Sequence, residues 1–436
     1  MLIVKKNHLR LKKNEYKFVR HLCRCSKNLY NQTLYQTRQH FFNCGEFLDY
    51  VQAYKLLKNS EVYKSLPSDP AQQVMKVVER NFRSFFGLLK KEQKGNYNRP
   101  INIPNFLDKQ GYFLVFYPTR PGRMKDNFSI LVPKYLQEKF GFKKLTIDRP
   151  EYTKGKKLKE VRILPKMRGG YFEIEWVYEE EQDIQELNKV TALGIDLGVD
   201  NLAACVNSKT GHSFIMDGKI IKSYNRYFNK ELSRIKSIHD KIKLKDSKRK
   251  SKMYLKRNRI LNDMLNQYVN YIIKYCIYHK IGNVVVGQGY LSQNSCNLGK
   301  QNNQNFTQIP FGKFCQKLQW KCEKYGIQYS SVEESYTSKC DHLAGERMKH
   351  AENYLGKRIK RGLFSSSTGV LLNADINGAL GILLKGKHKV DVNQLVSSGC
   401  LTQPSRISLL EIKDKSAIRL IELKSLINQA PRLALG

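Results

Sequence analysis

The chain has 436 residues, 41% of them hydrophobic, and its 77 Lys and Arg against 38 Asp and Glu give a formal net charge of +39. This length allows two or three domains with real cores, but so much positive charge repels itself unless a polyanion binds. A membrane surface is excluded as that partner by the lack of any run of about 18 apolar residues, and the start "MLIVKKNHLRLKKNEY" has no signal-peptide core. We therefore expect a nucleic-acid-binding protein of the cytoplasm, nucleoid-associated in a prokaryote.

The ten cysteines are scattered, and none of them forms a CxxC pair of the zinc-ribbon kind. Cys23 and Cys25 are close in sequence but would point in different directions on a helix. We expect reduced, mostly buried thiols.

The first residues alternate apolar with basic and predict a short strand, followed by helices over about 14–98. The clearest helix follows "LPSDPAQQ" and has apolar residues at spacings of three and four. These apolar residues are Val74, Val77, Val78, Phe82, Phe85 and Leu89. Lys76, Arg80 and Arg83 fall on another face, which is either a solvated charge stripe or a surface for nucleic-acid phosphates.

From about residue 101 the pattern has period two, as in "YFLVFYPTR", "FSILVP" and "KLTID". The pair "VRILP" and "YFEIEWVYEE" is joined across Gly169 and Gly170, which predicts a hairpin. These strands indicate a small β-barrel that completes a first domain at residues 1–185, and the acid-rich stretch "EEEQDIQELNK" suits a linker.

The second domain, 186–386, begins with three strands of an antiparallel meander, "ALGIDLG", "LAACVNS" and "HSFIMDG". "NVVVG" is an apolar strand of parallel-sheet character, "IPFGKFCQKLQWKCEKYG" a helix, "IQYSSVEE" a strand and "NADINGALGILLK" a closing helix. This order is the outline of an RNase H-like domain with a helical insertion, so the fold class is α+β. Residues 387–436 form a tail in which we find no site.

The insertion, about 219–280, predicts a basic helical hairpin. Between Lys219 and Arg259 there are sixteen Lys or Arg against three acids. A narrow apolar stripe is expected at Leu232, Ile235, Ile238 and Ile242. The candidate nucleic-acid-binding residues of the insertion are Lys248, Arg249, Lys252 and Arg257. A second basic segment, the loop "GKRIKRGL", carries Lys357, Arg358, Lys360 and Arg361, and a merely solvated loop is the alternative.

Acidic residues fall where such a sheet would bring them to one edge. Asp196 lies on the first strand, Glu333 and Glu334 follow the last strand, and Asp375 begins the closing helix. Neighbouring carboxylates repel one another unless a divalent cation lies between them, and two Mg²⁺ ions about 3.5 to 4 Å apart can drive phosphodiester hydrolysis.

Each acid has another explanation. Asp375 could cap its helix, and the Glu333–Glu334 pair could be a solvated strand end. "GIDLGVDN" around Asp196 also resembles the first phosphate loop of actin-like and Hsp70-like ATPases, but the second glycine-rich loop of that class, DxGxGT, is missing.

Five motifs in order, "GIDLGVDNLAA", "NNQNFTQIPFGKF", "EESYTSK", "GKRIKRGL" and "NADINGALGILLK", resemble the TnpB (OrfB) family of transposon-encoded RNA-guided nucleases. That family is related to type V CRISPR effectors and to Fanzor proteins, and "LPSDPAQQVMKVVERNFRSFF" is similar to its recognition-lobe helix. The resemblance implies a guide RNA made from the transposon end. It also implies a recognition lobe that reads a short adjacent motif in double-stranded DNA. The second domain would be a RuvC-like nuclease domain that cleaves DNA with Mg²⁺ through Asp196 and Asp375.

The sequence departs from this family at two places. Gly287 stands where the middle glutamate is usual, and by similarity to Fanzors we expect Glu334, three residues before Thr337, to be the catalytic and metal-binding replacement. Strand alternation lets only one of Glu333 and Glu334 face the metals. The zinc-binding cysteine pairs of many members are also missing, since this interval holds only Cys340, His342 and His350, so we expect no zinc.

Two other functions remain open. The missing acid at Gly287 favours a nuclease-inactive, RNA-guided DNA-binding repressor, whereas buried acids at Asp196 and Asp375 favour the enzyme. A CRISPR-associated effector with a different guide source is the third reading, and the sequence leaves the oligomeric state open.

Overall fold

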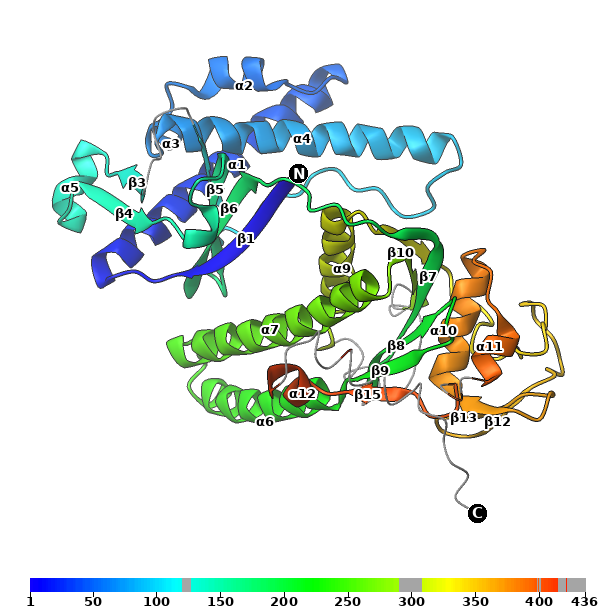
Figure 1. Cartoon of the computed structure of the whole chain (residues 1–436). Helices are drawn as coiled ribbons and strands as arrows, with labels where there is room; N and C mark the ends of the chain where they lie inside the picture. The colour runs from blue at the N-terminus through cyan, green and yellow to red at the C-terminus, as the bar shows by residue number, and fades with distance from the viewer. Residues whose placement is uncertain (120–126, 290–307, 398, 400, 415–420, 422–436) are drawn as a thin grey trace. The chain divides into compact units, whose positions relative to one another are not determined.

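The computed structural model describes all residues except 120–126, 290–307, 398, 400, 415–420 and 422–436 (Figure 1). The chain forms two compact units, one of Met1–Glu180 with Asp246–Lys252 and the other of Glu181–Lys245 with Met253–Gly436. The first unit combines helices with antiparallel strands and the second combines helices with a mixed sheet, so the expected α+β class is confirmed. Part of one quoted motif, 302–307, and two cysteines, Cys296 and Cys400, lie outside the described residues.

The first unit is built on a four-stranded antiparallel sheet in the order β1-β6-β5-β2. Its strands are β1 (Leu2–Leu9), β2 (Val115–Pro118), β5 (Leu158–Lys166) and β6 (Tyr171–Glu179). The hairpin expected at Gly169 joins β5 to β6, and Gly169 has the positive φ, 73°, that a tight turn requires. Strands β3 (Asn127–Leu131) and β4 (Lys144–Asp148) form a separate two-stranded sheet, so the small barrel stays a prediction.

Helices make up the rest of the first unit. They are α1 (Lys13–Cys44), α2 (Tyr50–Leu57), α3 (Glu61–Lys64), α4 (Ser68–Gln93), α5 (Lys134–Phe140) and the 3₁₀ turn η1 (Glu151–Thr153). The amphipathic pattern expected for α4 is present, because Val74, Val78 and Phe82 are buried while Arg80 and Arg83 are exposed.

The second unit contains a six-stranded sheet in the order β11-β10-β7-β8-β9-β15. Its strands are β7 (Asn188–Leu197), β8 (Asn201–Asn207), β9 (Ser213–Asp217), β10 (Ile281–Gly287), β11 (Gln328–Val332) and β15 (Ser405–Ile407). The expected meander β7-β8-β9 is antiparallel, and β10 and β11 join it in parallel, as the apolar "NVVVG" predicted. β15 comes from the tail, residues 387–436, for which no strand was predicted, and it pairs in parallel with β9.

Side-chain alternation along the strands divides the core between two faces of this sheet. Leu193 and Ile195 face a cluster with α7 (Lys248–Tyr278) and α9 (Phe311–Tyr325). Ala192 and Val285 face a second cluster with α10 (Ala374–Lys385). Helix α10 therefore lies on the opposite face of the sheet from α7 and α9 (Figure 1).

The basic insertion is formed by α6 (Lys219–Lys241) and α7, as expected. Its apolar stripe is shorter than expected, however. Ile235 is buried, but Ile238 and Ile242 are 54% and 63% exposed, because the stripe faces the core only over the first part of α6.

The segment predicted as the basic loop "GKRIKRGL" is a β-hairpin instead. β12 (Lys357–Lys360) and β13 (Leu363–Ser365) pair antiparallel, and β14 (Leu371–Asn373) completes a three-stranded sheet. Gly362 in the turn has a φ of 82°, which a glycine adopts without strain. Two short helices, α11 (Val392–Ser397) and α12 (Leu409–Asp414), follow α10, and no helix in the described ranges is long and apolar enough to span a membrane.

Candidate active site

Asp196 lies near the end of β7, in the middle of the sheet. Its neighbour Ile195 is fully buried, and hydrogen-bonded strands flank β7 on both sides. Burial raises the pKa of Asp196 well above its ordinary value, and the carboxylates of Glu334 and Asp375 raise it further. Glu334 and Asp375 are thus each close enough to Asp196 for their charges to act on its carboxylate.

Two glycines let α10 approach β7 closely. A Cβ atom added to Gly378 would lie 2.6 Å from Asp196 Oδ2, and one added to Gly194 would lie 2.5 Å from Leu383 Cγ. A side chain at either position would push the helix from the strand. The glycines therefore hold the first turns of α10, which carry Asp375, against the strand that carries Asp196.

Asp375 does not cap its helix. The cap is Asn373, whose side-chain oxygen accepts hydrogen bonds from the backbone N–H groups of Asp375 and Ile376. The Asp375 carboxylate instead accepts a hydrogen bond of 2.5 Å from Asn201 Nδ2, and Arg406 Nη1 donates to Asn201 Oδ1 at 3.3 Å. Sequence reasoning missed Asn201 and Arg406.

Glu334 occupies the space beside Gly287 that a side chain at that position would fill. A Cβ atom on Gly287 would lie 2.0 Å from Glu334 Oε1, and one on Gly289 would lie 1.8 Å from Glu334 Oε2. Burial raises the pKa of Glu334, although a hydrogen bond from the Gly289 backbone and the charge of Lys385 oppose the rise. Oε1 is buried and has no hydrogen-bond partner among the described residues.

Glu333 points away from this group. Its side chain is 77% exposed, accepts a hydrogen bond from the Ser335 hydroxyl and lies 3.9 Å from Lys385 Nζ. The alternation expected after β11 therefore directs Glu334, and not Glu333, toward Asp196.

The acids suit a divalent cation, although no group of three His, Cys, Asp or Glu side chains in the described part of the chain is arranged to hold one as it stands. Asp375 is engaged by Asn201, and Glu334 Oε1 is buried without a partner. A buried oxygen without a donor costs free energy, and mutually repelling carboxylates add to that cost. A hard cation would relieve both costs, since it takes carboxylate oxygens as ligands.

The segment between Thr337 and Asp375, for which no zinc site was expected, is held by hydrogen bonds to Asp341. This carboxylate is fully buried and accepts hydrogen bonds from the Ser366 hydroxyl at 2.9 Å and the Ser367 backbone at 2.7 Å. His342 Nε2 bonds the Thr337 carbonyl at 2.6 Å, and Cys340 Sγ donates to the Arg347 carbonyl at 3.6 Å. These hydrogen bonds connect residues 340–342 to the residues that follow β13 and to Thr337.

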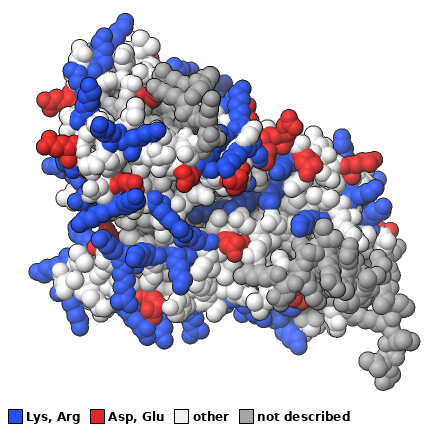
Figure 2. Space-filling model, turned by 60° about the vertical axis from the view of Figure 1, so that its left-hand side comes forward, with Lys and Arg blue, Asp and Glu red and all other residues white. Residues whose placement is uncertain are grey.

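Lys and Arg side chains are spread over the face shown in Figure 2, with Asp and Glu scattered among them. Lys357, Arg358, Lys360 and Arg361 are all exposed on or beside β12, and Arg361 pairs with Asp200. On α4, Arg83 pairs with Glu79 at 2.7 Å.

The candidates of the helical hairpin fall in both units. Lys248, Arg249 and Lys252 are exposed in the first unit. Arg257 lies in the second unit, and it differs from the expected projecting side chain because it is half-buried over the ring of Phe228.

Two family models match the chain. The model described as OrfB_IS605, probable transposase, matches residues 175–293, and the Cas12f1-like TNB domain matches residues 311–382. The chain is 25% identical over 413 residues to the TnpB-like protein ORF457 of Acidianus two-tailed virus, covering 84% of this chain and 83% of that protein. A cryo-EM structure of a Cas12f1–sgRNA–target DNA complex matches with a TM-score of 0.51 at 16% identity, covering 85% of this chain and 83% of that one. The structural match shows a shared fold.

Proposed function

We propose, from the premise that this chain belongs to the TnpB (OrfB) family related to type V effectors, that it is an RNA-guided DNA endonuclease. It would bind a guide RNA derived from the transposon end and recognise a short motif beside its target in double-stranded DNA. It would cleave that DNA by Mg²⁺-dependent hydrolysis of a phosphodiester bond. Base pairing would then select the sequence, while the protein reads the adjacent motif.

The sheet topology supports a RuvC-like nuclease domain in the second unit. Three antiparallel strands, β7-β8-β9, are extended by the parallel strands β10 and β11, and α10 closes one face. The acids lie at the end of β7, after β11 and at the start of α10. The Cas12f1 structure that shares this fold was determined with an sgRNA and target DNA, which supports RNA and DNA as partners.

The observation that carries the proposal is the fit of Glu334 to Gly287. The carboxylate of Glu334 fills the space that a side chain at position 287 would occupy, because a Cβ there would lie 2.0 Å from Oε1. This supports Glu334, which follows the adjacent strand β11, as the acid of the middle position. This weakens the main reason for reading the chain as a nuclease-inactive repressor.

The residues have separable roles in the reaction. Asp196, Glu334 and Asp375 would hold Mg²⁺, which when bound would activate water and stabilise the leaving oxygen of the phosphodiester. Asn201 orients the Asp375 carboxylate through its hydrogen bond. The close packing of Gly378 keeps Asp375 and Asp196 near each other.

The exposed cations would bind phosphates of the guide RNA and of the DNA. Arg80 and Arg83 of α4, Lys248, Arg249 and Lys252 of the hairpin, and the four cations of β12 and its turn are all exposed. Each phosphate contact releases counterions, so binding should weaken steeply with salt.

The test uses protein copurified with its RNA from cells that express the flanking transposon end. This complex is mixed with Mg²⁺ and a plasmid that carries the matching target beside a randomised motif. Asp196→Ala is run in parallel with the parent protein. We expect the parent to linearise the plasmid and the variant to bind the target without cutting it.

Guide-dependent binding without cleavage by the parent would overturn the endonuclease and leave the RNA-guided repressor. Cleavage that Asp196→Ala leaves intact would exclude the proposed site. Loss of activity when the transposon-end RNA is omitted, with rescue by a CRISPR-type RNA alone, would indicate a different guide source.

A further inference from the structure

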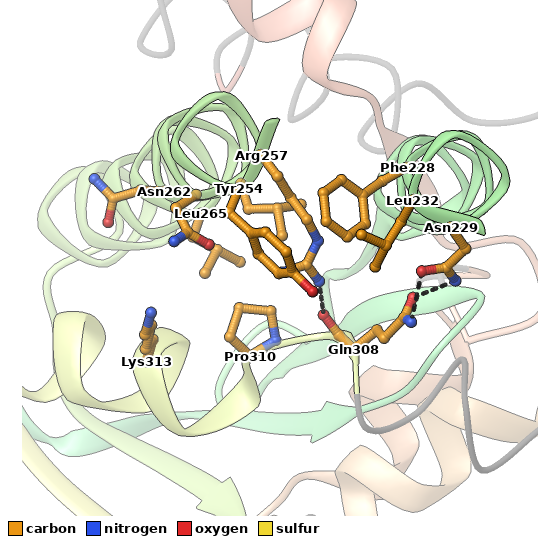
Figure 3. Close-up of a pocket in the computed structure, with 12 residues that line it drawn as sticks. Phe228, Asn229, Leu232, Tyr254, Arg257, Asn262, Leu265, Gln308, Pro310 and Lys313 are labelled. Carbon is orange, nitrogen blue, oxygen red and sulfur yellow. Dashed lines mark hydrogen bonds between the residues drawn. The ribbon is translucent and has the colours of Figure 1, made fainter. Parts of the chain in front are cut away.

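The second unit contains a cavity of about 320 Å³ between α6, α7 and the first turn of α9 (Figure 3). Leu261 and Leu265 on α7 are buried at its wall. The volume is at the lower end of the range for small-ligand pockets, so it suits a single nucleotide and not a duplex. The cavity takes no part in the chemistry proposed for the three acids.

One wall of the cavity is aromatic. Phe228 of α6 and Tyr254 of α7 meet edge to face, with ring centroids 5.1 Å apart and planes at 75°. Figure 3 shows the two rings side by side, with Pro310 on the other side of the space. Aromatic side chains placed in this way offer faces on which a planar base can stack.

Arg257 is a cation without a carboxylate partner among the described residues. Its Nε and Nη2 donate to Asn225 Oδ1 at 3.1 and 2.9 Å, Nη2 also donates to the Gln308 carbonyl at 3.1 Å, and the guanidinium lies 4.9 Å from the Phe228 ring centroid. Burial lowers the pKa of Arg257, which reflects the cost of holding this charge away from water. The hydrogen-bond partners of Arg257 named above are neutral. An anionic ligand would therefore offset the cost of burying its charge.

An amide pair gives the cavity a hydrogen-bonding edge. Asn229 Nδ2 donates to Gln308 Oε1 at 2.9 Å, and Gln308 Nε2 donates to Asn229 Oδ1 at 2.9 Å (Figure 3). Each amide keeps one further N–H and one further acceptor site, as the edge of a nucleobase requires. Lys313, exposed in the first turn of α9, adds a second cation to the lining.

We infer that this cavity binds one unpaired nucleotide of the guide RNA, with its base against the aromatic wall and the amide pair and its phosphate near Arg257 and Lys313. This inference rests on the proposed function, since that function supplies the RNA. Structured RNAs extrude bases from loops and bulges, and proteins stack such bases on aromatic and Arg side chains. The cavity lies between the two basic helices of the insertion, where an RNA backbone is expected.

The test is a series of guide RNAs, each lacking the base at one unpaired position, bound to the full-length protein at fixed salt. The parent is compared with Tyr254→Ala, which removes part of the aromatic wall, and with Asn262→Trp, which fills the cavity from its exposed rim. We expect one abasic position to weaken binding by the parent by roughly five- to 150-fold, the effect of losing one stacked base. In both variants the same abasic position should change RNA binding by no more than about twofold. The missing base and the protein substitution remove the same interaction, so their effects do not add.

Lys256→Ala, an exposed charge on α7 outside the cavity, is the matched control. It should lower the salt dependence of RNA binding and leave the sensitivity to the abasic position unchanged. The inference would be overturned if the parent binds its guide RNA and no abasic position weakens binding by the parent alone, without effect in the two variants. That result would leave the proposed function intact. A parent that copurifies with no RNA would instead overturn the proposed function.

Discussion

At the scale of single residues, two glycines leave room for the carboxylate that we propose as the middle acid of the site. Gly287 ends β10, and Glu334 follows the neighbouring strand β11. Because Gly287 and Gly289 have no side chains, the Glu334 carboxylate can lie in the space beside them. A side chain at position 287 would exclude the Glu334 carboxylate from this space, so the glycine at 287 and the glutamate at 334 depend on each other.

This feature predicts a marked effect of the smallest possible substitution. In Gly287→Ala the new methyl group would overlap Glu334 Oε1, which lies 2.0 Å from the position of the Cβ, and would displace the carboxylate. We expect cleavage to fall by about 100-fold, as it does for misplacements near 1 Å, while guide-dependent binding persists. Single-turnover cleavage of a target duplex measures the effect.

Gly312→Ala is the matched control, since a Cβ atom there meets nothing within 4 Å. It should cleave at the parental rate. Equal rates for Gly287→Ala and the parent would mean that Glu334 does not act from the position seen here.

The sequence indicated the three acids but not what surrounds them. Asp196 was identified because it interrupts an apolar strand, and Asp375 because it begins a predicted helix. That Asn373 is the cap, and that Asn201 holds Asp375, depends on side-chain directions that spacing does not determine. Arg257 was expected to project, but Phe228, 29 residues away on another helix, covers its guanidinium. Contacts between helices of this kind have no local signal.

At the scale of secondary-structure elements, a buried carboxylate ties the hairpin β12–β13 to the segment after Thr337. Burial alone would raise the pKa of Asp341, but hydrogen bonds from the Ser367 backbone and from the hydroxyls of Ser366 and Ser367 outweigh it and lower the pKa. The chain thus uses a hydrogen-bonded carboxylate to hold this segment against the residues that follow β13.

Asp341→Asn should therefore destabilise the second unit. The amide places N–H donors against the donors of Ser366 and Ser367, so we expect the free energy of unfolding to fall by about 2 to 3 kcal/mol. Urea denaturation followed by circular dichroism measures this change. Asp263→Asn, at an exposed position on α7, should change it by less than about 0.5 kcal/mol. Equal stability of both variants would show that the Asp341 network contributes nothing.

Elements with a clear period could be predicted, and short elements made by distant pairing could not. The strands β7 to β11 and the helices α9 and α10 carry apolar patterns of period two or 3.6, or an unbroken apolar run. β15 has only three residues and exists because β9 offers it an edge. The β12–β13 hairpin was expected to be a loop because four cations in eight residues conceal a strand pattern whose buried member is Phe364.

At the scale of the whole molecule, histidines should make stability depend on pH. Burial lowers the pKa of four of them, His21, His279, His342 and His388, below the ordinary value of 6.5. The unfolded chain then binds more protons than the folded one below pH 6.5, so the contribution to stability is complete above that pH and is lost as pH falls. The charge of +39 grows in the same direction and adds self-repulsion.

The raised pKa values of Asp196 and Glu334 act in the opposite direction, so the test uses protein with Asp196→Asn and Glu334→Gln. In this protein the expected result is a lower thermal unfolding midpoint at pH 5.5 than at pH 7.5, at equal ionic strength and without nucleic acid. His342→Gln should flatten part of this dependence, since His342 is buried and the glutamine that replaces it cannot take up a proton. A midpoint that is unchanged or higher at pH 5.5 would contradict the account.

Composition and pattern indicated two domains and a tail, whereas the structure places Asp246–Lys252 with the first unit and the tail with the second. The function depends on whether one particular glutamate is catalytic. The most direct measurement is the rate of target cleavage by Glu334→Gln beside Glu333→Gln, with RNA-loaded protein and saturating Mg²⁺. The two substitutions remove the same charge from adjacent residues, one facing Asp196 and the other 77% exposed. We predict at least about a 100-fold loss for Glu334→Gln, as expected for a lost metal ligand, with target binding retained and a parental rate for Glu333→Gln. Parental cleavage by Glu334→Gln, or an equal loss in both variants, would contradict the proposed site.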